Sequence, residues 1–246
     1  MSRFPRSRKA AGYSVSQIPD LRNLRNWTAE ERWIWLRQFA MLQVGLFLFA
    51  FALMLSLYAN IGANSWMVFH HGIALQSPLT IGQASQFIGL IMIFISWLAG
   101  IRPGFGTVLN MFLVGLFMDL IDLTGLVPTM TSLPGQVGML GASILILGLS
   151  SGMYIKAGFG AGPRDSFHLA VIELTNLSIT VSRWAIEASV VVLGILMGGQ
   201  FGVGTIIYAA LIGPSVGLGF RVFGLYRKPR ERAETEATPA PAPQSD

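Results

Sequence analysis

The residues best suited to chemistry lie in the polar segment Gly160-Ala161-Gly162-Pro163-Arg164-Asp165. Proline is favoured in the first turn of a helix, where its missing N–H costs nothing, so Pro163 predicts a helix start. Asp165 then lies beside the unpaired N–H groups and the positive end of the helix dipole. With the forked guanidinium of Arg164, this arrangement predicts a site for an anion or ion. The alternative is that Asp165 only caps the helix and pairs with Arg164 or Lys156.

Histidine residues suggest a second element of the site. His168 follows Asp165 by three residues and shares its helix face, and His70 occupies the matching place in the first half of the chain. If the two imidazoles approach each other, they suit a proton relay or a polar constriction, because histidine titrates near neutral pH. The alternative is that each histidine bonds a backbone carbonyl. The chain around His70 lacks a carboxylate to complete a metal site, so we expect no metal.

Arg183 and Glu187 are a third candidate pair. They are four residues apart, so they share one face of a helix and can pair. Glu187 lies near the middle of an apolar stretch, where an ionised group costs ~3 kcal/mol or more unless it is paired or hydrated. This placement fits either a functional charge or an ion pair that fixes the register of the helix.

Membrane helices must position these residues. Hydrophobic residues make up 52% of the 246 and charged residues 12%, about half the share of a soluble domain, which excludes a cytoplasmic globular protein. Asp, Glu, Lys and Arg are absent from 38–101, 123–155 and 188–220. Since a span needs ~20 apolar residues, we predict six spans, at 38–59, 80–100, 104–122, 138–157, 178–198 and 203–223.

The remaining segments complete the organisation. Two short apolar helices are predicted at 65–76 and 163–174, and their glycine-rich hinges contain Gly62, Gly160, Gly162 and Pro163. Residues 1–37 form a basic segment that ends in an interfacial helix, 123–137 an outer loop, and 224–246 a disordered tail. The net charge of +5 gathers near the ends of the chain, which favours membrane orientation and anionic-lipid binding over nucleic-acid binding. Without cysteine, the chain has neither a disulfide nor a thiolate metal site.

The chain also overlies itself when it is shifted by 98 residues. Gly62 then falls on Gly160, and His70 falls on His168. The copies, 38–122 and 138–223, each predict three spans with a short helix after the first. If the short helices cross the membrane, the copies are parallel four-span units, and if they re-enter from one side, the copies are inverted three-span units.

Basic residues decide between these topologies. Lys and Arg favour short cytoplasmic loops, and a six-span chain with both termini in the cytoplasm puts Arg102, Lys156 and Arg164 on that side. We therefore expect an all-α membrane protein of six transmembrane helices. They form two inverted three-helix repeats, each with a short re-entrant half-helix after its first span.

Several motifs resemble the YczE/YyaS/YitT family of bacterial membrane proteins across about residues 40–224. They are Ala59-Asn60-Ile61-Gly62, Pro103-Gly104-Phe105-Gly106-Thr107 with Asn110, Gly160–Asp165, Gly202-Val203-Gly204-Thr205 and Gly213-Pro214. The resemblance implies an integral protein of the bacterial plasma membrane whose molecular activity is uncharacterised. Family members tend to carry Pro-Trp-Asp after the first break, whereas this chain has Ser65-Trp66-Met67.

These observations favour a transporter or channel for a small solute or ion in the bacterial inner membrane. Its candidate site residues are Arg164, Asp165, His168, His70, Glu187 and Arg183. The alternative is a scaffold or regulatory partner that transports nothing. No nucleophile with its base and no nucleotide-binding loop is present in the sequence, so we expect no enzymatic activity and no cofactor. The expected partners are the bilayer and an unknown small solute, and a homo-oligomer is the alternative to a monomer.

Overall fold

The computed structural model describes residues 27–160 and 162–225, and these residues contain helices and connections but no strand. The described residues form eight helices: α1 (Ala29–Tyr58), α2 (Ser65–Gln76), α3 (Ile81–Leu98), α4 (Phe105–Thr124), α5 (Leu133–Lys156), α6 (Pro163–Thr175), α7 (Ile179–Leu196) and α8 (Val203–Val222). All except α2 and α6 are long and apolar enough to cross a membrane. The prediction of an all-α protein with six membrane-length helices is therefore confirmed. The predictions for residues 1–26 and for the tail from 226 lie outside the described residues.

Local capping explains where the helices begin. Thr28 and Glu31 form a capping box, in which Glu31 N–H donates to Thr28 Oγ1 at 3.2 Å and Thr28 N–H donates to Glu31 Oε2 at 2.8 Å. From this cap α1 continues to Tyr58, so the expected interfacial helix and the first span are one helix. At α5, Ser132 is the N-cap and Pro134 lies in the first turn, so this helix begins at Leu133 rather than at 138.

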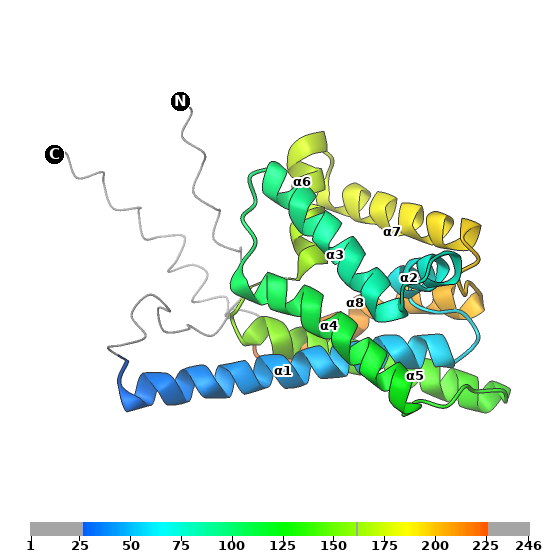
Figure 1. The fold of residues 1–246 in the computed structure, drawn as a ribbon, viewed down its shortest axis with the longest axis horizontal. Helices are drawn as coiled ribbons and strands as arrows, with labels where there is room; N and C mark the ends of the chain where they lie inside the picture. The colour runs from blue at the N-terminus through cyan, green and yellow to red at the C-terminus, as the bar shows by residue number, and fades with distance from the viewer. Residues whose placement is uncertain (1–26, 161, 226–246) are drawn as a thin grey trace.

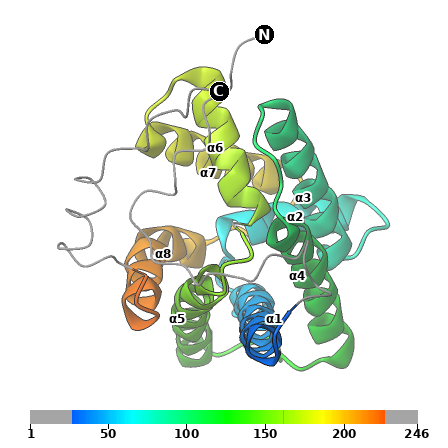
Figure 2. The ribbon, with the colours of Figure 1, turned by 90° about the vertical axis from the view of Figure 1, so that its left-hand side faces the viewer.

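The first helices of the two halves, α1 and α5, lie side by side and antiparallel (Figures 1 and 2). Gly45 of α1 faces Tyr154 near the end of α5, where an added Cβ would lie 3.0 Å from the Tyr154 nitrogen. Further along α1, the carbonyl oxygen of Ala52 accepts a hydrogen bond of 2.6 Å from Ser143 Oγ. Because α1 is flanked by other helices, most of its second half is buried.

The last helix of each half runs parallel to the first helix of that half. Gly148 of α5 faces Ser215 of α8, and one turn on Gly152 faces Gly219. The missing side chains let the two backbones approach closely, as small residues do between membrane helices. Helix α4 lies along α1 in the same sense. As a result, α8 ends at the same end of the molecule as α1 begins (Figure 1).

The short helices α2 and α6 run across the long ones. In Figure 1, α2 is seen end-on and α6 is upright, whereas α1, α5 and α7 lie horizontally. Helix α2 packs mainly on α7, and α6 packs mainly on α3. At the α2–α7 crossing, a Cβ on Gly194 would lie 2.8 Å from the backbone of Val68 and Phe69. Each short helix therefore packs mainly against the third helix of the other half.

Two equivalent hydrogen bonds join the halves. Gly204 N–H at the start of α8 donates to the carbonyl oxygen of Ile61 at 2.8 Å, and Gly106 N–H at the start of α4 donates to that of Phe159 at 2.9 Å. The two bonds are equivalent under the 98-residue shift. The donor Gly106 corresponds to the donor Gly204, and the acceptor Phe159 corresponds to the acceptor Ile61. In each case the loop before a short helix holds the start of the last helix of the other half.

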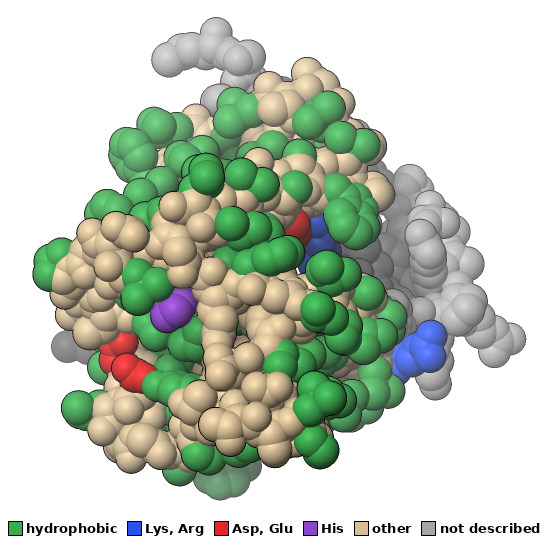
Figure 3. All heavy atoms as spheres, turned by 90° about the vertical axis from the view of Figure 1, so that its right-hand side faces the viewer, with side chains coloured by type: hydrophobic (Ala, Val, Ile, Leu, Met, Phe, Trp, Pro, Cys, Tyr) green, Lys and Arg blue, Asp and Glu red, His purple; other side chains and the backbone are tan. Residues whose placement is uncertain are grey.

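The surface matches a membrane environment. Large apolar side chains are exposed along α3, α4, α7 and α8, for example Phe94 at 54% and Leu196 at 77%. Figure 3 views the molecule from the end where α1 stops, and this end carries few charged side chains. Contact with a lipid bilayer accounts for this exposed apolar area.

Candidate functional site

Arg164 and Trp66 bring the two short helices together. Each is the second residue of its helix, and the 98-residue shift places Trp66 on Arg164. The guanidinium carbon Cζ lies 4.8 Å from the centre of the Trp66 ring and 5.9 Å from that of Phe49. These are distances at which an aromatic face attracts a cation. Trp66 is buried and Arg164 is half-buried, so the contact lies inside the protein.

Glu187 is held by the same tryptophan. Its Oε1 accepts a hydrogen bond of 3.0 Å from Trp66 Nε1, which connects α7 to α2. Arg183 lies one turn earlier on α7 and is exposed. In the described part of the chain, the hydrogen-bond partner of Glu187 is therefore Trp66, and the predicted pairing with Arg183 does not form.

Asp165 caps the helix in which it lies. Its Oδ2 accepts hydrogen bonds from Gly162 N–H at 3.3 Å and from Tyr154 Oη–H at 3.4 Å. The capping part of the alternative is thus observed, with Tyr154 of α5 as the second hydrogen-bond partner of Asp165. Asp165 and Glu187 both act electrostatically on Arg164. We call Trp66, Tyr154, Arg164, Asp165 and Glu187 the α2–α6 cluster.

The histidines lie beside this cluster without forming a pair. His70 of α2 is 1% exposed, and its ring centre lies 6.3 Å from that of Trp66. His168 of α6 is half-buried and lies within electrostatic range of Asp165 and Glu187. Among the described residues, neither Nδ1 atom has a hydrogen-bond partner, and no hydrogen bond or ring contact joins the two histidines. The alternative, in which each histidine bonds a backbone carbonyl, is thus not seen at either Nδ1 atom.

The predicted hinge residues differ in conformation. Gly62 and Gly160 have φ angles of +116° and +122°, a region that glycine occupies without steric cost. Gly162 has an ordinary φ of −67° and is the N-cap of α6, and Pro163 begins the helix as predicted. A Cβ at position 162 would lie 3.5 Å from the side chain of Asn110, an ordinary contact distance, so neither the backbone angle nor the space requires glycine there.

Sequence reasoning missed the roles of Trp66 and Tyr154. The 98-residue shift was a usable signal for Trp66, because it pairs this residue with Arg164. Nothing in the local sequence marks Tyr154, whose partner Asp165 follows it only after a turn and a helix start. Both side chains are buried, and both hold a carboxylate next to Arg164.

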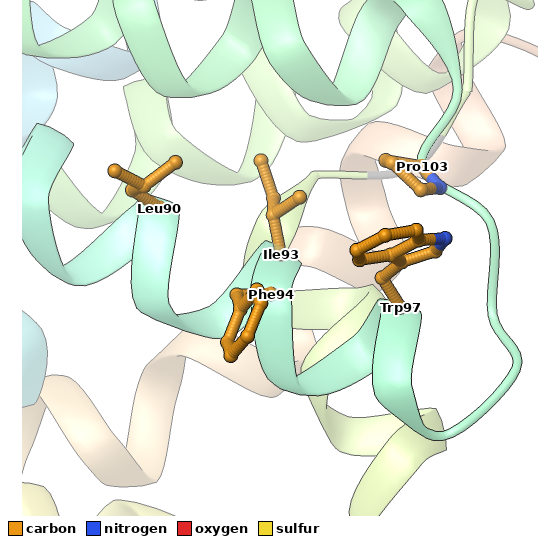
Figure 4. A pocket seen from close by; sticks show the side chains of 5 residues that line it. All are labelled: Leu90, Ile93, Phe94, Trp97 and Pro103. Carbon is orange, nitrogen blue, oxygen red and sulfur yellow. The ribbon is translucent and has the colours of Figure 1, made fainter.

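Two hollows on the surface are lined by none of the five cluster residues. One is lined by apolar side chains of α3 and by Pro103 (Figure 4). Another lies along α7 at Ala188, Ser189, Val192 and Leu193. Within this cluster, Trp66 and Tyr154 are buried, Arg164 and Glu187 are half-buried, and Asp165 is exposed.

Comparison with known proteins confirms the family resemblance. Residues 36–220 match the family of unknown function DUF6198. The chain is 32% identical to the uncharacterised membrane protein YczE of Bacillus subtilis (strain 168), over 69% of this chain and 79% of that protein. It is 31% identical to an uncharacterised protein of Haemophilus influenzae, over 78% and 87%, and 23% identical to the uncharacterised protein YyaS of Bacillus subtilis, over 69% and 86%. No solved structure matches the chain.

Proposed function

Since the chain belongs to the family of unknown function DUF6198, we propose its function from its own geometry: a transporter or channel for a small solute or ion, with the α2–α6 cluster as its binding site. The observation that carries this proposal is the charged cluster itself. Asp165 and Glu187 both act electrostatically on Arg164, and the three residues lie among helices long enough to cross a membrane. A charged side chain at that depth costs ~3 kcal/mol or more, which is why such residues commonly mark solute and ion pathways.

The proposed topology is two inverted three-helix repeats with re-entrant short helices. With 12 and 13 residues, α2 and α6 measure ~18–20 Å at ~1.5 Å per residue, less than the ~30 Å of hydrocarbon. The antiparallel α1 and α5 and the equivalent bonds at Gly106 and Gly204 support the inversion. Half-helices that meet at a repeat interface place their positive N-terminal ends at the solute site in other transporters.

The proposed orientation puts the start of α1 and the end of α8 in the cytoplasm of a bacterial cell. Basic residues at this end support it: Arg32, Arg37, Arg102, Lys156 and Arg221. The opposite end contains the α4–α5 loop, in which 125–132 carry no Lys or Arg. Short cytoplasmic loops of inner-membrane proteins are enriched in Lys and Arg.

Reconstitution tests the proposal. The full-length protein in liposomes should carry protons or a small organic anion faster than empty vesicles. The double variant Asp165→Asn/Glu187→Gln should abolish this flux, because it removes both cluster carboxylates. Glu173→Gln is the matched control, since Glu173 is an exposed acidic residue of α6. A broad solute panel without flux above empty vesicles would favour the scaffold function instead.

A further inference from the structure

Arg164 has donors that the described chain leaves unused. A guanidinium carries five N–H donors in a rigid fork. Its recorded contacts are the rings of Trp66 and Phe49, and no described residue accepts a hydrogen bond from it or forms an ion pair with it. Arg164 is half-buried, so water or a ligand can reach these donors and supply the acceptors that a charged group needs.

The neighbouring carboxylates already have other donors. Asp165 Oδ2 accepts from Gly162 N–H and Tyr154 Oη–H, and Glu187 Oε1 accepts from Trp66 Nε1. These two acidic residues act on Arg164 through space without reaching its donors. The acceptor that fits Arg164 must therefore come from outside the described chain.

His70 provides an independent sign of a ligand. Its side chain is 1% exposed, and its Nδ1 has no hydrogen-bond partner among the described residues. The imidazole lies against the same indole ring over which Arg164 is placed, and the Arg164 charge acts on it. A neutral imidazole can donate from Nδ1 to an anion. Arg164 and His70 thus contribute unused polar groups around one ring.

We infer that Arg164 and His70 bind a small carboxylate. This inference rests on the proposed function and names its solute class. The planar fork of arginine matches two carboxylate oxygens, which a spherical halide lacks. The rings of Trp66 and Phe49 offer an apolar wall to a short alkyl group beside the carboxylate.

Thermal unfolding of the purified full-length chain in detergent tests this assignment, with sodium acetate as the probe and sodium chloride at equal ionic strength as the reference. Acetate should raise the unfolding midpoint in a saturable way, since a ligand that binds only the folded state stabilises it. Arg164→Gln should abolish the acetate effect, and Arg164→Lys should weaken acetate binding by about tenfold, because the fork is lost. Arg102→Gln, at an exposed arginine of the α3–α4 connection, should bind acetate like the wild type.

Three results would overturn the inference: no acetate-specific shift in the wild type, an equal shift with chloride, or an undiminished shift in Arg164→Gln. If Arg164→Gln does not fold, as judged by size-exclusion chromatography, Arg164→Lys and His70→Phe take its place, and undiminished acetate binding in both is the contrary result. Flux assays separate this inference from the proposed function. Acetate binding without flux of any solute contradicts transport alone, and flux that Arg164→Lys leaves unchanged contradicts the carboxylate site alone.

Discussion

At the scale of single residues, Trp66 connects the parts of the site. Its ring faces the Arg164 guanidinium, and its Nε1–H is bonded to Glu187. A cation over an indole contributes ~0.5–2 kcal/mol, depending on how far the pair is removed from water. One side chain therefore holds an arginine of α6 and a glutamate of α7 in a fixed relation.

Replacing this tryptophan separates its two roles. Trp66→Phe keeps an aromatic face for Arg164 but leaves the Glu187 carboxylate without its donor. We expect the free energy of unfolding in mixed micelles to fall by about 1–3 kcal/mol, the cost of a polar group left unsatisfied inside a protein. Trp184→Phe is the control, since Trp184 lies on α7 and is 67% exposed.

A double-mutant cycle completes this test. Trp66→Phe and Glu187→Gln should be coupled by about 0.5–3 kcal/mol, because each removes part of the same bond. Equal losses in Trp66→Phe and Trp184→Phe would show that the Nε1–H bond contributes nothing to stability.

At the scale of elements, the loops that precede the two short helices hold the two halves together. Gly106 and Gly204 each begin the last helix of one half and donate to a loop of the other half. A Cβ on Gly106 would lie 2.4 Å from the Phe159 carbonyl oxygen, and one on Gly204 would lie 2.6 Å from that of Gly62. Neither position can accept a side chain unless the backbone of the facing loop moves.

Alanine substitutions test this role. Gly106→Ala and Gly204→Ala should each lower the free energy of unfolding by about 1–3 kcal/mol, the usual cost of overpacking. Gly213→Ala is the matched control, because a Cβ there meets nothing within 4 Å. Alanine at 213 should be neutral or stabilising by up to ~1 kcal/mol, since glycine is the poorer helix former. An unaffected Gly106→Ala protein would mean that the loop does not hold α4.

At the scale of the whole molecule, the direction of the chain decides the topology. Six crossings place the α4–α5 loop outside the cell and the α6–α7 loop inside it. Eight crossings would place both loops inside. The short helices run roughly perpendicular to the long ones (Figures 1 and 2). This arrangement is expected of segments that do not span the membrane.

Cysteine labelling distinguishes these topologies, because the sequence contains no cysteine of its own. Ser132→Cys and Leu177→Cys would introduce single thiols at exposed positions of the two loops. In intact cells, an impermeant maleimide should label Ser132→Cys, and it should label Leu177→Cys only after permeabilisation. Protection of both positions in intact cells would establish eight crossings and remove the basis for an inverted repeat.

The sequence determined most of the helices and the individual candidates for the site. Charge-free stretches, capping residues and glycine-rich breaks act locally, so α2 is found at the predicted 65–76 and α6 begins at the predicted Pro163. The position of Asp165 at an N-terminus could be predicted for the same reason. The uninterrupted α1 could not, because an apolar span and an amphipathic interfacial helix can join without any local signal.

Only the tertiary structure decided which side chains meet. Trp66 and Glu187 are 121 residues apart, and the sequence instead favoured Arg183 as the partner of Glu187 because it is one turn away. Spacing along a helix shows which residues share a face, but it does not show which other helix covers that face. Which helix covers the Glu187 face of α7 depends on the packing of α2 against α7 and on the glycines that allow this packing. The same packing leaves Arg164 facing an aromatic ring rather than a carboxylate.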